Sequence, residues 1–203
     1  MNEPTNEPMN GGNLTGDNEV MKLAAENGQL NIVKVLAERG MSMDDEGDES
    51  PIYCAAINGH MDVIRYIIDN TESSESMVKS ISNSVTETKH LEVIKYFVEE
   101  CGISDELKNE ALVSASTMDN VEIVDYLIDK GADVRYKHDD ALRCAAECGN
   151  LEVVRLLVKR GADIEICDQE FIEKLKEESD ELDDDYMDII EYLKRQFNEL
   201  LRG

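Results

Sequence analysis

One apolar pattern recurs five times along the chain at an almost constant step, and this repetition constrains the fold more than any other feature. Each copy has an amphipathic run anchored by an aliphatic residue: Leu30, Met61, Leu91, Val121 and Leu151. The steps between these anchors are 31, 30, 30 and 30 residues. A fixed period of this length is the signature of a repeat architecture, in which each copy is one small structural unit.

Each copy predicts two short helices joined by a turn. In the fifth copy Leu151, Val154, Leu157 and Val158 place apolar side chains on one face of the second helix. Gly161, directly after two basic residues, is a typical C-terminal signal. The first helices carry pairs of small residues that allow close packing: Ala24 and Ala25, Ala55 and Ala56, Ala145 and Ala146. A single helix pair cannot bury its own apolar face, so we expect the pairs to stack around one continuous core.

The residue pattern of these copies resembles that of ankyrin repeats. The resemblance is clearest in "SPIYCAAINGHMDVIRYIIDN" (50–70) and "ALRCAAECGNLEVVRLLVKRGADI" (141–164). It implies an all-α ankyrin-repeat solenoid of stacked helix-turn-helix pairs with short β-hairpin-like fingers. The repeat is 30 residues, whereas the family repeat has about 33. The deficit lies in the finger, between Gly131 and Ala141 in the best-defined case.

Repeats shortened in this way are similar to those of the ankyrin proteins of amoeba-infecting giant DNA viruses, the mimivirus type. That resemblance implies a viral protein in the host cytoplasm that engages a host protein.

The repeat register predicts three parts of the chain. Residues 1–16 are polar and rich in Asn, Gly, Pro and Glu, and we expect them to be disordered. Residues 17–167 hold the five repeats, which span about 17–47, 48–77, 78–107, 108–137 and 138–167. Residues 168–203 carry a degenerate version of the two-helix pattern, which predicts a sixth repeat, or helical cap, with a lengthened acidic turn at 180–185. The third copy is crowded with Ser and Thr, so we expect residues 72–90 to be the least stable interior segment.

The five cysteines suggest packing more than chemistry. Cys144 and Cys54 fill the same repeat slot as Leu23, which indicates a buried apolar slot in which reduced cysteine acts as a small hydrophobe. Cys148 stands at a variable, more exposed position. His138 lies several residues from the pair, in the finger, and a zinc site needs three or four converging ligands. We therefore expect no metal, although a metal or redox sensor built on Cys144 and Cys148 remains an alternative.

Nothing in the chain predicts catalysis. The three histidines fall in different repeats, and no nucleotide-binding glycine motif is present. His60 and His90 occupy the turn between the two helices, where the ordinary role is a structural hydrogen bond. We expect a protein that is not an enzyme, with no catalytic residues and no cofactor.

The charge of the chain restricts its partners. Asp and Glu number 46 against 20 Lys and Arg, which gives a net charge of -26. Such a field disfavours nucleic acid and anionic membranes and favours basic protein partners. We see neither a secretory signal nor an apolar run of membrane-spanning length, and the odd number of cysteines indicates an intracellular, reducing compartment. We expect a monomer.

The family resemblance implies that contacts are made by a concave face of finger tips and exposed first-helix positions. Transferred by repeat position, it marks nine candidate partner-binding residues: Ile57, Asn58, Met118, Arg135, Tyr136, Lys137, His138, Glu147 and Cys148. The function that follows is a non-enzymatic protein–protein interaction module. An adaptor that recruits an enzyme or ligase complex is the alternative.

Overall fold

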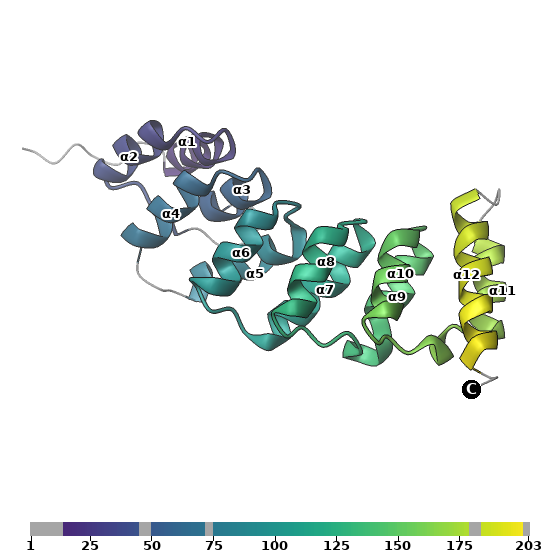
Figure 1. Ribbon diagram of the computed structural model, residues 1–203. Coiled ribbons are helices and arrows are strands. Elements are labelled where there is room, and N and C mark those ends of the chain that lie inside the picture. The colour runs from purple at the N-terminus through teal and green to yellow at the C-terminus, as the bar shows by residue number, and fades with distance from the viewer. Residues whose placement is uncertain (1–13, 45–49, 72–74, 179–183, 201–203) are drawn as a thin grey trace, which may run out of the picture. The chain divides into compact units, whose positions relative to one another are not determined.

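The computed structural model describes residues 14–44, 50–71, 75–178 and 184–200, and these consist of helices and turns with no strand among them. Two compact units divide the chain, Met1–Ser84 and Val85–Gly203, and helix α5 belongs to both (Figure 1). Within the described part of the chain no helix is long and apolar enough to cross a membrane. The helices in order are α1 (Leu14–Glu26), α2 (Leu30–Glu38), α3 (Pro51–Ile57), α4 (Met61–Asn70), α5 (Glu75–Glu87), α6 (Leu91–Glu99), α7 (Asp105–Thr117), α8 (Val121–Asp129), α9 (Tyr136–Glu147), α10 (Leu151–Lys159), the 3-10 helix η2 (Ile164–Ile166), α11 (Gln169–Glu178) and α12 (Asp184–Leu200).

The first unit contains two helix pairs, and the corresponding helices of the two pairs pack against each other. The first helices α1 and α3 contact each other, and so do the second helices α2 and α4. Helix α3 begins at a cap in which Ser50 Oγ accepts a hydrogen bond from Tyr53 N at 3.2 Å, with Pro51 in the first turn. The sequence Ser50-Pro51 at the start of the second copy therefore forms the N-terminal cap of α3.

A histidine joins the two pairs of the first unit. His60 Nε2 lies 2.8 Å from the carbonyl oxygen of Glu26, at the end of the preceding first helix, and its N–H donates to that oxygen. The imidazole lies against Gly28, where an added Cβ would come within 2.6 Å of Nδ1. Gly28 also has φ +64°, a left-handed conformation that favours glycine. The structural role predicted for His60 is confirmed.

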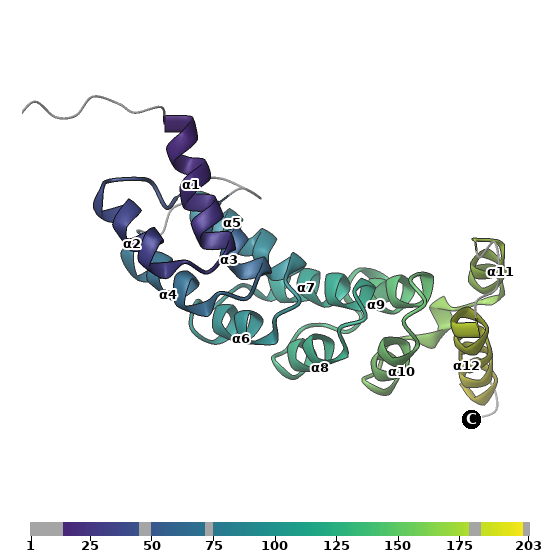
Figure 2. The same ribbon diagram turned by 90° about the horizontal axis from the view of Figure 1, so that it is seen from above.

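In the second unit the first and second helices form two rows. Figure 2 shows α7, α9 and α11 in one row and α8, α10 and α12 in the other. Helix α9 contacts both α7 and its own partner α10, and α10 contacts α8 and α12. Stacking of neighbouring pairs therefore buries the apolar faces that one pair alone cannot cover.

The same turn-to-carbonyl hydrogen bond recurs along the second unit. Asn150 Nδ2 donates to Ser116 O at 2.7 Å, and Asn120 Nδ2 donates to Lys89 O at 3.2 Å. Before α12, Tyr186 takes this place: its hydroxyl donates to Glu147 O at 2.8 Å. Its ring lies against Gly149, as the His60 ring lies against Gly28. At the C-terminal helix pair a tyrosine thus donates the hydrogen bond to the preceding copy that Asn or His donates in earlier copies.

The buried face of α10 differs from the one that the periodicity predicted. Val154 and Leu157 are fully buried as expected, but Leu151 and Val158 are only half-buried. Val153 is fully buried too, because a second helix packs against pairs on both sides and therefore buries more than one stripe. The six alanines of the first helices are all buried, which confirms their role in close packing.

The structure describes only some of the segment boundaries that the sequence predicted. Residues 1–13 of the expected tail lie outside the described residues, and α1 already begins at Leu14. The acidic turn at 180–185 is described only from residue 184, and residues 72–74 of the weak third copy are not described. The described part of that copy is helical in α5, where Ser82 Oγ donates to Val78 O at 2.9 Å. Hydroxyls bonded to the preceding turn in this way slightly destabilise a helix.

The short finger of the fifth copy is made of turns. Lys137, His138 and Asp139 all have left-handed backbones, with φ of 50°, 60° and 58°. Asp139 is only 4% exposed, and its Oδ1 accepts a hydrogen bond from Asp163 N at 2.7 Å. His138, expected in the finger, therefore lies in a left-handed turn inside the bounds of α9.

Candidate functional site

The nine predicted contact residues do not form one cluster. Ile57 ends α3 and Asn58 caps it, both in the first unit. The other seven belong to the second unit, where they lie at the two ends of α9 and at the end of α7. The amide of Asn58 donates to Cys54 O at 2.8 Å, so this side chain is already engaged within its own helix.

At the N-terminal end of α9, two of the four predicted residues are bound within the chain. Arg135 Nε donates to Gly161 O at 3.1 Å, and the Tyr136 hydroxyl donates to the Glu106 carboxylate. That hydrogen bond is the main cause that raises the pKa of Tyr136. Lys137 and His138 are exposed, and the Lys137 ammonium lies 4.8 Å from the centre of the Tyr136 ring. His138 is therefore accessible to a partner here, and Lys137 is exposed but held against the Tyr136 ring.

At the C-terminal ends of α7 and α9 lie Met118, Glu147 and Cys148. Met118 is half-buried and caps α7, and Cys148 is exposed and caps α9. Glu147 forms an ion pair of 2.8 Å with Lys174 of α11. Of these three residues, Cys148 is the most accessible to a partner.

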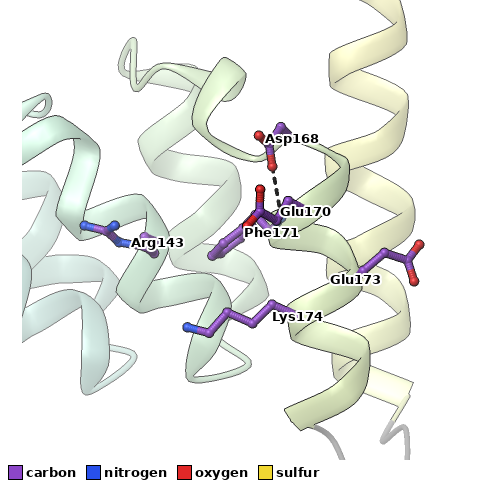
Figure 3. A pocket seen from close by; sticks show the side chains of 6 residues that line it. All are labelled: Arg143, Asp168, Glu170, Phe171, Glu173 and Lys174. Atoms are coloured by element: carbon purple, nitrogen blue, oxygen red, sulfur yellow. Dashed lines mark hydrogen bonds between the residues drawn. The ribbon is translucent and has the colours of Figure 1, made fainter.

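The structure also contains a pocket that the sequence did not predict, between α9 and α11. Its volume is about 520 Å³. In Figure 3 Phe171 and Lys174 extend from α11 toward α9, and Arg143 lies on α9 across the pocket. Asp168 caps α11, because its Oδ1 accepts a hydrogen bond from Phe171 N at 2.9 Å. The lining residues are Arg143, Asp168, Glu170, Phe171, Glu173 and Lys174.

The charges around this pocket leave it acidic. Arg143 is paired with Asp140 at 2.5 Å, and Lys174 is paired with Glu147, so each cation is already balanced by a carboxylate of α9. Glu173 is paired with Lys176 at 2.8 Å, which is the main cause that lowers the pKa of Glu173.

Two carboxylates of the pocket remain uncompensated. Asp168 and Glu170 are exposed, and among the described residues neither forms an ion pair with a cation. They lie beside the half-buried ring of Phe171. An aromatic face with a negative rim can hold a cation.

Sequence reasoning missed this pocket for a physical reason. The segment "QEFIEKLKEES" (169–179) lies within residues 168–203, which the repeat register assigns to a cap, and Phe171 is its single aromatic residue. That lone aromatic in an acidic helix was the available signal. The space between α9 and α11 depends on how closely two helices from different copies pack, and no local pattern encodes that distance.

The cysteine slot is only partly the buried slot that was predicted. Cys54 is buried as expected, whereas Cys144 is half-buried and Leu23 is 48% exposed. The prediction is wrong for Leu23, because in the described residues no repeat precedes α1 to cover it. Burial is the main cause that raises the pKa of the Cys144 thiol. Among the described residues, no three His, Cys, Asp or Glu side chains are gathered as they would be to hold a metal ion.

Comparison with known proteins agrees with this architecture. The family model for ankyrin repeats (three copies) matches residues 5–78 and again 82–168. Among solved structures, the chain is similar to the crystal structure of the human ASB11 ankyrin repeat domain, with 23% identity and a TM-score of 0.59. That likeness covers 71% of this chain and 69% of the other, and it concerns the fold. No curated protein matches the chain. Since the family model covers most of the described helices, this chain belongs to the ankyrin-repeat family.

Proposed function

We propose that this chain is a non-enzymatic module that binds a basic protein segment on the exposed side of α7, α9 and α11, called here the first-helix face. The observation that carries the proposal is the pocket of about 520 Å³ between α9 and α11. Ankyrin repeats are generic protein–protein interaction modules, and this pocket lies on their first-helix row.

The chemistry of the pocket suits an arginine or lysine side chain of the partner. The ring of Phe171 offers a face for a cation–π contact, worth about 0.5 to 2 kcal/mol depending on desolvation. Asp168 and Glu170 offer carboxylates to the same cation. The net charge of -26 supports the proposal further, because it speeds encounter with basic partners and makes binding sensitive to salt.

The predicted contact residues extend this site without forming its centre. Cys148 and Glu147 lie near it at the end of α9, since Glu147 pairs with Lys174 of the pocket lining. Lys137 and His138 lie at the other end of α9 and would contact a different part of the same partner.

The biological setting that we propose comes from the resemblance of the 30-residue repeats to giant-virus ankyrin proteins. In that setting the chain acts as a monomer in a reducing host compartment and engages a host protein. The resemblance alone supports this part of the proposal.

Selection from a displayed library of random 12-residue peptides tests the function. We expect peptides selected on the wild-type protein to contain a central Arg or Lys and to bind Phe171→Ala at least about 10-fold more weakly. Tyr126→Ala, on α8 in the second-helix row, is the matched aromatic control, because Tyr126 is half-buried like Phe171 but lies outside the first-helix face, and it should retain binding. Circular dichroism of both variants checks that the fold is kept. Peptides without a basic residue, or equal binding to Phe171→Ala, would contradict the proposal.

A further inference from the structure

The first repeat exposes an apolar slot that every later copy buries. Ile32 on α2 is 43% exposed. The residues at the same register in the later second helices are at most 1% exposed: Val63, Val93, Ile123, Val153 and Ile189. The chemistry of the slot is the same in all copies, so only its coverage differs.

Three more aliphatic side chains share this exposure. Val20 and Leu23 on α1 are 47% and 48% exposed, and Val35 on α2 is 45% exposed. Cys54, in the slot of Leu23 one copy later, is 3% exposed. Helices α1 and α2 contact each other, so the four residues belong to one helix pair. We call Val20, Leu23, Ile32 and Val35 the N-terminal apolar face.

What covers this slot elsewhere in the chain is a helix. Within the first unit α1 packs on α3 and α2 on α4, and within the second unit α7 packs on α9 and α8 on α10. In each case the earlier pair covers the later one. The N-terminal apolar face therefore lies at the position where a neighbouring helix pair packs in later copies.

The size and charge of the face decide between possible occupants. Four half-exposed aliphatic side chains leave an apolar patch on the order of a few hundred Å², the size of patch that is often functional on a monomer. A stable dimer buries about 800 Å² on each partner, and two copies of charge -26 repel each other. A single helix from another protein fits the patch better than a second copy does.

The net charge of the chain indicates the polar side of that helix. Glu19 and Glu26 are exposed on α1, on either side of Val20 and Leu23 in the sequence. Lys22 and Arg39 balance these two carboxylates, but the chain as a whole carries a net charge of -26. Electrostatic complementarity therefore favours a basic partner.

We propose that the N-terminal apolar face docks one amphipathic helix of a basic partner protein, in the place where a preceding repeat packs in later copies. Val20 and Leu23 lie three residues apart on α1, as do Ile32 and Val35 on α2, so each pair shares one face of its helix. The partner helix would place aliphatic residues spaced three and four apart against these pairs. This site is independent of the Phe171 pocket and does not rest on the function proposed above.

A designed 18-residue Leu/Lys peptide with one apolar helical face is the probe, and fluorescence anisotropy at two salt concentrations is the readout. We expect the double variant Leu23→Gln, Ile32→Gln to bind it at least about 10-fold more weakly than wild type. Val78→Gln is the matched control, because Val78 is 59% exposed but lies on α5, outside the face. It should bind like wild type.

Three results would overturn the proposal. The first is equal binding by the double variant. The second is equally tight binding of a scrambled peptide of the same composition, which would mean that charge alone drives association. The third is a wild-type dimer in sedimentation analysis that the double variant abolishes, which would make a second copy the occupant. Since the substituted side chains are exposed, the variants should fold, and circular dichroism checks this.

Discussion

The carboxylate of Asp139 connects the fifth copy to the turn that follows α10. It is buried, and its Oδ1 accepts a hydrogen bond from Asp163 N at 2.7 Å. One copy earlier, Asn109 Oδ1 accepts from Asp133 N at the same 2.7 Å, but that contact is exposed to solvent. Asp139 also has φ 58°, whereas Asn109 has an ordinary negative φ. The chain thus provides its own control for the effects of burial and of the left-handed backbone.

We predict that Asp139→Ala lowers the free energy of unfolding by about 2 to 3 kcal/mol. Loss of the acceptor leaves the Asp163 N–H without its partner in a partly buried turn, which costs about 1 to 2 kcal/mol. Alanine tolerates the left-handed backbone less well than aspartate does, which adds about 1 kcal/mol. For Asn109→Ala we expect about 0.5 to 1 kcal/mol, because water can replace the acceptor and the backbone is not left-handed. Asp139→Asn keeps an acceptor and a residue that tolerates this backbone, so its loss should stay below about 1 kcal/mol.

Guanidinium unfolding followed by far-ultraviolet circular dichroism measures these differences, since the chain contains no Trp for fluorescence. Amide exchange of residues 151–167 localises them, because a repeat array need not unfold as one unit. The reasoning is refuted if Asp139→Ala costs no more than Asn109→Ala. It is equally refuted if Asp139→Asn loses as much stability as Asp139→Ala, since the acceptor would then not be the cause.

Three further predictions concern the C-terminal helix pair, pH and the weak third copy. Tyr186→Phe should cost about 1 kcal/mol and speed amide exchange in α12 but not in α8, because it removes one hydrogen bond to the preceding first helix; unchanged exchange in α12 would count against this. Burial raises the pKa of the Cys167 thiol to about 12, so this thiol stays protonated in the folded chain while it ionises near pH 9 when unfolded. The free energy of unfolding should therefore fall as pH rises from about 9 toward 12, by at most about 1.4 kcal/mol per pH unit. Chemical unfolding at pH 8 and pH 10.5 measures this loss, and Cys167→Ala should remove the part of it that comes from this thiol. Amides of residues 72–90 should exchange faster than those of 111–129 and 141–159, and equal protection of the three segments would contradict the prediction.

Much of the fold could be predicted from local pattern. The step of 30 residues, the paired alanines and the aliphatic stripe specify two helices in each copy, and these features need no knowledge of distant contacts. The slot of His60 predicted a structural hydrogen bond, and the bond to Glu26 O is present. The same logic did not foresee Tyr186 in this role, because it follows Asn150 by 36 residues, whereas the earlier copies follow one another by about 30.

The candidate site was harder to predict. Repeat position marks which side chains can face solvent, but Arg135, Tyr136 and Glu147 are engaged by groups 26 to 30 residues away in the sequence. Whether a marked residue is free depends on the copy beside it, and the pattern of one copy does not contain that information. The pocket at Phe171 has the same origin, since its walls come from two separate copies.

The sequence by itself determined the repeat, the helices and the acidic character of the chain, because periodicity and composition are local properties. Only the tertiary structure decided which equivalent residues are covered. Ile32 and Val153 occupy the same slot, yet one is 43% exposed and the other fully buried. Burial is a property of the neighbour as much as of the residue. In a stacked array the end copy therefore has the same sequence pattern as an interior copy but presents a different surface.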